Sequence, residues 1–336
     1  MGYISYFDLL GTRGFKDNSY EYEKNINIFY SEIRKGASYL CGFGEIGIFS
    51  DSVYVYSRDL ERLLHYLMYL RNSLCSRGLF FNAVVSHGEL NILDTQEWKI
   101  DVPVYGVGFT DNSIINLYLE QTRFKGIGIK IDESIVEKVK DIKSIKISNS
   151  FFYSSSSTPD LILYYDIAYD IKNAPYKNKM KNTVKAITKS ALKAYSVNIN
   201  HGKYYTSLFS TILDSYDYKE LDWSWDDENK KFYNLPEIFN TIINISTGKY
   251  KECINWIGID ALCLKIIDMA ISSEKINDRN LKKIITNFIN YPYLKKYMNS
   301  LETLPQVFTS SKNKDKFLDY VQDYITYDLV NKLISK

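Results

Sequence analysis

The chain has 336 residues, of which 45% are apolar, and its 42 basic and 40 acidic side chains leave a net charge of +2. This length and apolar content suffice for one large domain or two ordinary ones, which excludes a chain that is disordered over most of its length. The balanced charge argues against a dedicated duplex-DNA binder, which would carry a basic surplus, and no stable nucleic-acid partner is expected. The four cysteines form no CxxC pair, so the spacing of a zinc site is missing.

The apolar residues are spread along the chain rather than gathered in one long run. No stretch of about 18 consecutive apolar residues occurs, so we expect no transmembrane helix and no membrane partner. Asp8 interrupts the first apolar run and no basic region precedes it, so we expect no signal peptide and a cytoplasmic protein.

The first half of the chain alternates short strand patterns with amphipathic helix patterns. Aromatic and β-branched runs between turn residues predict the strands, and apolar residues three and four positions apart predict the helices. The order begins β-α-β-β-α-β, which is the split βαβ or ferredoxin-like arrangement of palm domains. We therefore expect an α+β fold in which helices cover one face of the sheet and leave the other face open for a ligand or partner. The predicted elements are, in chain order, a strand at Tyr3–Leu10, a helix at Tyr20–Tyr39, strands at Phe43–Phe49 and Val53–Tyr56, a helix at Leu60–Leu74, a strand at Phe80–Ser86, a helix at Ser113–Gln121 and a strand at Ile127–Ile131.

The second half of the chain is predicted to be mainly helical. A strand at Asp160–Ile167 follows a serine-rich loop and extends the sheet, and the polar, acidic stretch Asp222–Asn229 predicts a domain boundary. We expect a first domain over residues 1–218, with its core in residues 1–170, and an all-α C-terminal module over residues 230–336. The predicted helices are Lys181–Ser196, Tyr204–Leu213 after a break at His201-Gly202, Pro236–Ile245, Ile254–Ile271, Asn280–Ile289 and Lys316–Ile334.

Two aspartates fall where this topology brings carboxylates together. Asp8 ends the first strand, and Asp51 lies in the turn between the second and third strands. Each aspartate alone is typical of a cap or turn, but in a split βαβ sheet the central first strand neighbours that hairpin, so both reach one edge. Hard oxygen ligands suit Mg²⁺, and phosphoryl-type transfer from a nucleoside triphosphate uses two such ions. Gly11 and Gly14 would let backbone N–H groups approach the phosphates.

Four motifs resemble those of class III nucleotide cyclases. FDLLGTRGF at Phe7–Phe15 resembles their first metal motif, and FSDSVYVY at Phe49–Tyr56 resembles their second. FFNAVVSHGEL at Phe80–Leu90 resembles the strand that follows, and YGVGFTDNSIINLYLEQT at Tyr105–Thr122 resembles the next helix. The most similar variant is the pyrimidine cyclase of the bacterial Pycsar antiphage systems. The resemblance covers residues 1–170 and extends more weakly to residue 215.

This resemblance implies a metal-dependent cyclase with two Mg²⁺ or Mn²⁺ ions in each site. Asp8 and Asp51 would be the metal ligands, and the carbonyl of Leu9 would add a third oxygen. The 3′-hydroxyl of the substrate's own ribose would attack its α-phosphate and expel pyrophosphate. The backbone that would hold the triphosphate is that of Gly11, Thr12, Arg13, Gly14 and Phe15.

The chain departs from the family pattern on the last core helix. Class III cyclases usually carry an Asn and an Arg four residues apart there, and these positions are Ile114 and Tyr118. The residues that would substitute as catalytic groups are Asn112, Asn116 or Arg123.

A second departure concerns the base of the nucleotide. Gly47 stands where the family carries an adenine-selecting Lys, and Asn82 stands where relatives often carry an Arg. Phe43, Phe49 and Phe81 would narrow the pocket around a smaller base. We therefore expect Gly47 and Phe49 to contact the substrate, and UTP or CTP to be preferred over ATP.

The expected function is thus the conversion of UTP or CTP to cyclic UMP or cyclic CMP in bacterial antiphage signalling. The resemblance implies a head-to-tail homodimer with sites at the subunit interface, and indirect coupling to an effector that responds to the cyclic nucleotide. Two alternatives stay open: a palm-type synthase of cyclic di- or oligonucleotides, and a catalytically degenerate nucleotide-binding sensor or scaffold. The mass of the product would distinguish a synthase of cyclic di- or oligonucleotides from the cyclase. A lack of metal-dependent pyrophosphate release would favour the sensor or scaffold.

Overall fold

The chain forms two compact units, one of residues 1–150 and 157–186 and the other of residues 151–156 and 187–336. The predicted domain ranges of 1–218 and 230–336 stay a prediction. The computed structural model describes residues 2–11, 19–89, 112–123, 126–145, 147–150, 158–161, 185–192, 199–229, 231–232, 234–246, 259–289, 308 and 310–334.

The described part of the first unit is built on a mixed seven-stranded sheet in the order β2-β3-β1-β4-β5-β7-β6. β1 pairs antiparallel with both β3 and β4, β2 is antiparallel to β3, and β5 joins β4 in parallel. The first four strands therefore have the split βαβ order, in agreement with the predicted palm-like arrangement. The strands are β1 Gly2–Leu9, β2 Gly44–Phe49, β3 Ser52–Ser57, β4 Phe81–Gly88, β5 Gly128–Ile131, β6 Ile147–Ser150 and β7 Thr158–Leu161.

Beyond β5 the sheet differs from the prediction. β7 begins at Thr158, ahead of the predicted strand start at Asp160, and it pairs with β5 at Lys130 and with β6 along its length. β6 is not predicted, because a strand of four polar and apolar residues carries too short an alternation to be recognised. The rest of the predicted strand, residues 162–167, lies outside the described residues.

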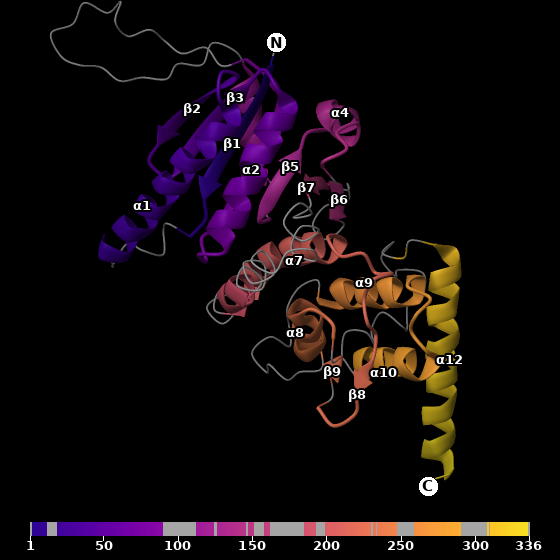
Figure 1. Cartoon of the computed structure of the whole chain (residues 1–336). Coiled ribbons are helices and arrows are strands. Elements are labelled where there is room, and N and C mark those ends of the chain that lie inside the picture. Colours follow the sequence, from indigo (N-terminus) through magenta and orange to yellow (C-terminus); the bar gives the residue numbers. More distant parts are fainter. Residues whose placement is uncertain are drawn as a thin grey trace, which may run out of the picture. The chain divides into compact units, whose positions relative to one another are not determined.

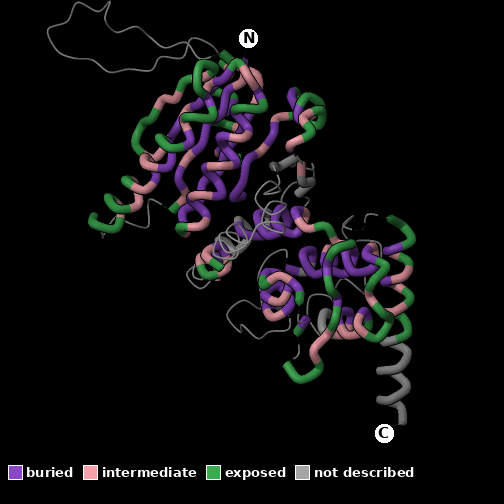
Figure 2. Tube along the Cα trace, viewed as in Figure 1, coloured by how far each residue is buried: buried purple, intermediate pink, exposed green. Residues whose placement is uncertain are grey.

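The two faces of the sheet bury different side chains of the central strand. Phe7 and Leu9 of β1 belong to the core formed with α1 (Ser19–Gly36) and α2 (Leu60–Cys75), which run across one face of the sheet (Figure 1). Ile4 and Tyr6 lie on the opposite face, because side chains alternate along a strand. Figure 2 accordingly shows buried residues along these strands and exposed residues on the outer side of α1. Burial on both faces explains why β1 is apolar along most of its length.

The second face of the sheet is not left open, contrary to the expectation. α3 (Asn112–Arg123) packs against β1 and β4 and buries Ile114 and Leu117. Their partners on the sheet are Ile4, Tyr6 and Val84. Ile114 and Leu117 are three residues apart, so they share one side of the helix, and this apolar side covers the sheet. The shorter helical segments of this unit are η2 Ala37–Leu40, η4 Glu133–Ile135 and α4 Val136–Lys140.

The described part of the second unit is mainly helical. It also contains the short antiparallel pair β8–β9, so the prediction of an all-α module is not confirmed. Trp223, within the predicted boundary stretch, packs its ring edge-on against Phe232 and Phe239. The elements are α7 Ile199–Asp214, β8 Trp225–Asp226, β9 Lys231–Phe232, α8 Glu237–Ser246, α9 Ile259–Ser272, α10 Asp278–Ile289 and α12 Ser311–Ile334.

Two helices of this unit begin five residues earlier than predicted, and α10 begins two residues earlier. α7 runs through Gly202, where the sequence predicts a break, because a helical glycine costs only about 1 kcal/mol. Packing of α7 against α8 and α9 offsets that cost. α12 begins at Ser311 rather than Lys316, because its first turn is polar and lacks the apolar spacing that predicts a helix.

Among the described residues, no helix is both long and apolar enough to span a bilayer.

Candidate metal and nucleotide site

Asp8 and Asp51 lie at the same end of the paired strands β1 and β3. Asp8 is opposite Ser52 in the ladder between these strands, and the amide of Leu9 donates to the carbonyl of Asp51 at 3.0 Å. Both aspartates are half-buried, so each keeps part of its side chain open to solvent. The structure thus brings together the two segments that carry the predicted metal ligands.

Asp8 accepts a short chain of hydrogen bonds from side chains on its own face of the sheet. The hydroxyl of Ser52 donates to Oδ1 of Asp8 at 3.1 Å, and the hydroxyl of Tyr6 donates to Oγ of Ser52 at 3.2 Å. Burial raises the pKa of Tyr6 to about 12, and the nearby Asp8 carboxylate acts in the same direction. Tyr6 therefore stays protonated, and remains a donor, at neutral pH.

Asp51 lies in a two-residue turn that α1 supports. Ser50 precedes it with a φ of 57°, in the left-handed region that costs a residue with a Cβ about 1 kcal/mol. Tyr30 of α1 donates to the carbonyl of Ser50 at 2.9 Å, and the hydroxyl of Tyr22 lies 3.4 Å from Oγ of Ser50. Burial raises the pKa of Tyr30, and Tyr22 and the Asp51 carboxylate act in the same direction. These contacts hold the strained turn, and with it the backbone of Asp51, in place.

Three of the predicted substrate-binding residues are described. Gly11 has a φ of 84° and has open space where a side chain would be. Gly47 lies opposite Tyr54 in the β2–β3 ladder, and Phe49, at the end of β2, is 79% exposed. Leu9 buries its side chain in the core, which leaves only its backbone to act as a ligand. The remaining loop residues, Thr12, Arg13, Gly14 and Phe15, lie outside the described residues.

One of the phenylalanines predicted to narrow the base pocket lies on the wrong face of the sheet. Phe81 is buried beside Phe7, with 5.0 Å between the ring centroids. It pairs with Leu9 in the β1–β4 ladder, and both side chains point into the core with α1 and α2. Phe43 precedes β2, and the guanidinium of Arg62 lies over its ring at 4.4 Å. The prediction for Phe81 is therefore wrong.

The three predicted catalytic residues of α3 lie on its outer side. Asn112, Asn116 and Arg123 are exposed and share one stripe of the helix, because they are four and seven residues apart. Arg123 pairs with Glu120 at 3.0 Å. The opposite side of α3 packs on the sheet that carries Asp8. Within one described chain, the three residues are therefore not brought together with Asp8.

A cluster of tyrosines beside Asp8 is missing from the prediction. The ring centroid of Tyr6 lies 4.7 Å from that of Tyr54 and 5.8 Å from that of Tyr118. Burial raises the pKa of Tyr54, and Tyr118 and Asp8 act in the same direction. Alternation along β1 is the signal that would have found part of this cluster, because Tyr6 and Asp8 are two residues apart and share a face.

Two polar pairs also fix α3 to this face. Nε2 of Gln121 donates to Oδ1 of Asn82 at 2.6 Å, and both side chains are buried. Asn82 is opposite Asp8 in the β1–β4 ladder, so this pair borders the site. Lys130 of β5 contacts Glu120 at 2.7 Å, and this hydrogen bond lowers the pKa of Glu120. The helix is thus held by paired polar groups as well as by apolar contact.

The donor set fits a hard divalent cation that shares its coordination with a substrate. Asp8 and Asp51 offer carboxylate oxygens, and Mg²⁺ commonly uses one or two carboxylates together with substrate phosphates and water. In the part of the chain that the structure describes, no group of three or more His, Cys, Asp or Glu side chains would hold a metal alone. A cation at this site would therefore depend on the phosphates of a bound nucleotide.

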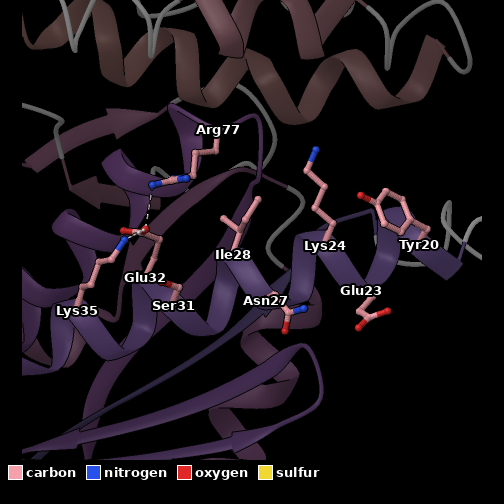
Figure 3. A pocket seen from close by; sticks show the side chains of 9 residues that line it. All are labelled: Tyr20, Glu23, Lys24, Asn27, Ile28, Ser31, Glu32, Lys35 and Arg77. Atoms are coloured by element: carbon pink, nitrogen blue, oxygen red, sulfur yellow. Dashed lines mark hydrogen bonds and ion pairs between the residues drawn. The ribbon is translucent and has the colours of Figure 1, made fainter.

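A separate pocket of about 480 Å³ lies along α1 (Figure 3). Glu32 is among its lining residues, and it pairs with Lys35 at 2.7 Å and Arg77 at 3.2 Å. Figure 3 shows both cations turned towards this carboxylate. Neither Asp8 nor Asp51 lines the pocket, so it is distinct from the candidate site. The other lining residues are Tyr20, Glu23, Lys24, Asn27, Ile28 and Ser31.

Comparison with known proteins adds little to this site. No protein-family model and no curated protein matches the chain. Among solved structures, that of a bacterial light-regulated adenylyl cyclase aligns with 47% of this chain and 87% of its own, at 12% sequence identity and a TM-score of 0.33. This score is too low to bear on fold or function, so neither rests on it.

Proposed function

We propose that the chain is a metal-dependent nucleotide cyclase that converts UTP or CTP to the 3′,5′-cyclic monophosphate and pyrophosphate. The observation that carries this proposal is the meeting of Asp8 and Asp51 at one end of β1 and β3, joined through the 3.0 Å bond from Leu9 to Asp51. The motifs around the two aspartates are those that resemble class III cyclases, and the strand order supports the same reading.

The described residues have separate parts in this reaction. Two divalent cations, when bound, would neutralise the triphosphate and activate the attacking hydroxyl. Asp8, Asp51 and the carbonyl of Leu9 would hold these cations. Gly11, with its left-handed backbone and open surroundings, lets the chain pass close to the phosphates. The ribose 3′-hydroxyl then loses its proton to water and its oxygen bonds to the α-phosphorus. The bond from the α-phosphorus to the oxygen that bridges to the β-phosphate breaks, and pyrophosphate leaves with that electron pair.

The base preference rests on the surface beside Tyr54. Gly47 lies opposite Tyr54 and offers no cation to an adenine ring. Phe49 lies two residues further along β2, on the same face, and is largely exposed. An aromatic surface without the adenine-selecting Lys supports a pyrimidine substrate.

A head-to-tail homodimer would complete each site. The exposed stripe of Asn112, Asn116 and Arg123 points away from its own sheet, so it would reach the aspartates of a second copy. Ile115, Tyr118 and Leu119 of α3 and Phe49 of β2 are large apolar side chains that remain exposed, as expected of a surface that a partner covers. The cyclic product would act on a separate effector in antiphage signalling, as the resemblance implies.

One observation favours a second candidate, a nucleotide-binding sensor without catalysis. Ile114, at a position where class III cyclases usually carry a polar catalytic residue, is only 3% exposed and packs against Ile4 and Val84. A side chain in that core cannot touch a phosphate. The sensor would keep the metal pair and bind nucleotide without releasing pyrophosphate.

The products formed from each ribonucleoside triphosphate test the proposal. The full chain is incubated with ATP, GTP, CTP or UTP and Mn²⁺, and products are measured by mass spectrometry. Cyclic UMP or cyclic CMP, absent with Asp8→Asn, is the expected result. A cyclic dinucleotide or oligonucleotide would show that another nucleotide supplies the hydroxyl, and the absence of pyrophosphate with all four substrates would favour the sensor.

A further inference from the structure

The hydrogen-bonded chain from Tyr6 through Ser52 to Asp8 has no assigned role in the proposed reaction. Tyr6 and Asp8 are two residues apart on β1, and Ser52 is directly opposite Asp8 on β3, so all three share one face of the sheet. The chain has a single direction, because the hydroxyl of Tyr6 donates to Ser52 and the hydroxyl of Ser52 donates to Asp8.

The strands do not need these hydroxyl groups in order to pair. The β1–β3 ladder extends over six residue pairs, from Tyr3 with Ser57 to Asp8 with Ser52, and β1 is also paired with β4 along its whole length. The Tyr6 ring is packed independently, against Tyr54 and Tyr118. Removing one hydroxyl therefore leaves the backbone of Asp8 in place and changes only what holds its carboxylate.

We infer that Ser52, supported by Tyr6, is a positioning residue that orients the Asp8 carboxylate for a divalent cation. This inference rests on the proposed function. Metal-binding carboxylates are usually held by such outer hydrogen bonds, and loss of one typically costs 10- to 100-fold in metal affinity or activity. Tyr6 is well suited to the outer position, because it is 4% exposed and its hydroxyl donates to Oγ of Ser52 at 3.2 Å.

The test measures Mn²⁺ binding to the full chain in the presence of 3′-deoxy-UTP, which cannot cyclise, by the loss of the electron paramagnetic resonance signal of free Mn²⁺ when protein is added. It also measures the Mn²⁺ concentration that gives half-maximal turnover with UTP. Ser52→Ala should weaken binding about tenfold, and Ser52→Thr, which keeps the hydroxyl, should restore it. Tyr6→Phe should weaken binding by about two- to fivefold, because it removes a bond one step further out. Excess Mn²⁺ should restore turnover in Ser52→Ala but not in Asp8→Asn.

Ser86→Ala provides the matched control. Ser86 lies on the same face in β4, opposite Ile4, and its hydroxyl donates to the carbonyl of His87 at 3.0 Å. This variant should bind Mn²⁺ like the wild type. Thermal unfolding of every variant identifies any loss of folding, and Tyr6→Phe supplies a second readout should Ser52→Ala fail to fold.

The outcomes separate the inference from the proposed function. If Mn²⁺ binding depends on Asp8 but is unchanged in both Ser52→Ala and Tyr6→Phe, the inference is overturned and the cyclase proposal stands. If wild-type binding does not depend on Asp8 and no cyclic product forms, both are overturned. A graded loss, largest for Asp8→Asn and smaller for Ser52→Ala and Tyr6→Phe, supports both.

Discussion

At the scale of single residues, the two aspartates depend on different kinds of support. Asp8 lies within a strand, and a hydrogen bond to its carboxylate comes from Ser52. Asp51 lies in a turn whose strained residue, Ser50, is held by Tyr30 and Tyr22 of α1. A change in α1 would therefore disturb Asp51 more than Asp8.

Replacing either aspartate with asparagine should abolish turnover while the protein stays folded. Asp8→Asn and Asp51→Asn keep the shape of the side chain and remove a hard anionic ligand. Product formation from UTP and CTP, with circular dichroism as a check of folding, measures this. Asp141→Asn, at an exposed position after α4, serves as control and should remain active. Retention of more than about a tenth of wild-type turnover by either variant would contradict the two-metal reading.

Gly47 should influence which base the enzyme accepts. Wild-type kcat/KM should be higher with UTP or CTP than with ATP, because no cation lies at this position to recognise adenine. Gly47→Lys introduces such a cation opposite Tyr54 and should shift the kcat/KM ratio towards ATP by about tenfold, which equals about 1.4 kcal/mol. A wild-type enzyme that prefers ATP would refute the base assignment and leave the cyclase proposal intact.

At the scale of elements, Glu32 links α1 to α2. Its carboxylate is 2% exposed and accepts hydrogen bonds from Lys35, Tyr69 and Ser73, while Arg77 lies within 3.2 Å. Burial alone would raise the pKa of Glu32, but the bonds from Lys35, Ser73 and Tyr69 together lower it below its usual value. The charged form of Glu32 is therefore the form that stabilises the fold.

Glu32→Gln should lower the free energy of unfolding by about 1–3 kcal/mol at neutral pH, since it removes the charge from a buried hydrogen-bonded group. Because the folded-state pKa is lowered, the contribution of Glu32 is fully present above the unfolded-state value of about 4.3 and is lost as the pH falls through the folded-state pKa. Denaturant unfolding should thus show a difference between wild type and Glu32→Gln that shrinks below about pH 4. Glu23→Gln, exposed on α1, should show no such difference. A pH-independent difference would mean that the charge of Glu32 is unimportant.

The sequence predicts elements best where one periodicity extends over many residues. β1, α2 and the β2–β3 hairpin match the structure closely, and their order is enough to bring Asp8 and Asp51 together. β6 is missed because it is short, and the break at Gly202 is wrong because packing overrides a weak local preference. The coverage of the second face by α3 depends on tertiary contacts such as Gln121 with Asn82, which no local pattern reveals.

At the scale of the whole molecule, the two sides of α3 lie in different surroundings. Its inner side fixes the helix to the sheet, and its outer side carries Asn112, Asn116 and Arg123 in solvent. A residue on the outer side cannot turn to the sheet beneath it without unpacking Ile114 and Leu117. If these outer residues are catalytic, they act on a substrate held by the aspartates of a second copy, and each site is composite.

Mixing two inactive variants tests this arrangement. One is Asp8→Asn, and the other replaces Asn112, Asn116 and Arg123 with alanine. Each alone should be inactive, because both of its sites lack one half. Random exchange makes about half of the dimers mixed. Each mixed dimer has one site with intact aspartates and an intact helix, and a second site that lacks both. About a quarter of all sites are then intact, so the mixture should recover about a quarter of wild-type turnover.

Subunit exchange is verified separately, by pull-down of an untagged variant with a tagged one. As a control, Asp8→Asn mixed with Asp51→Asn should stay inactive, because both changes fall in the same half of every site. Activity in this control would mean that Asp8 and Asp51 of one chain belong to two different sites. If exchange is verified and the first mixture stays inactive, each site lies within one subunit. The inactivity of the triple variant would then come from lost folding or lost pairing and not from a catalytic role of Asn112, Asn116 and Arg123, because α3 directs them away from the aspartates of their own chain.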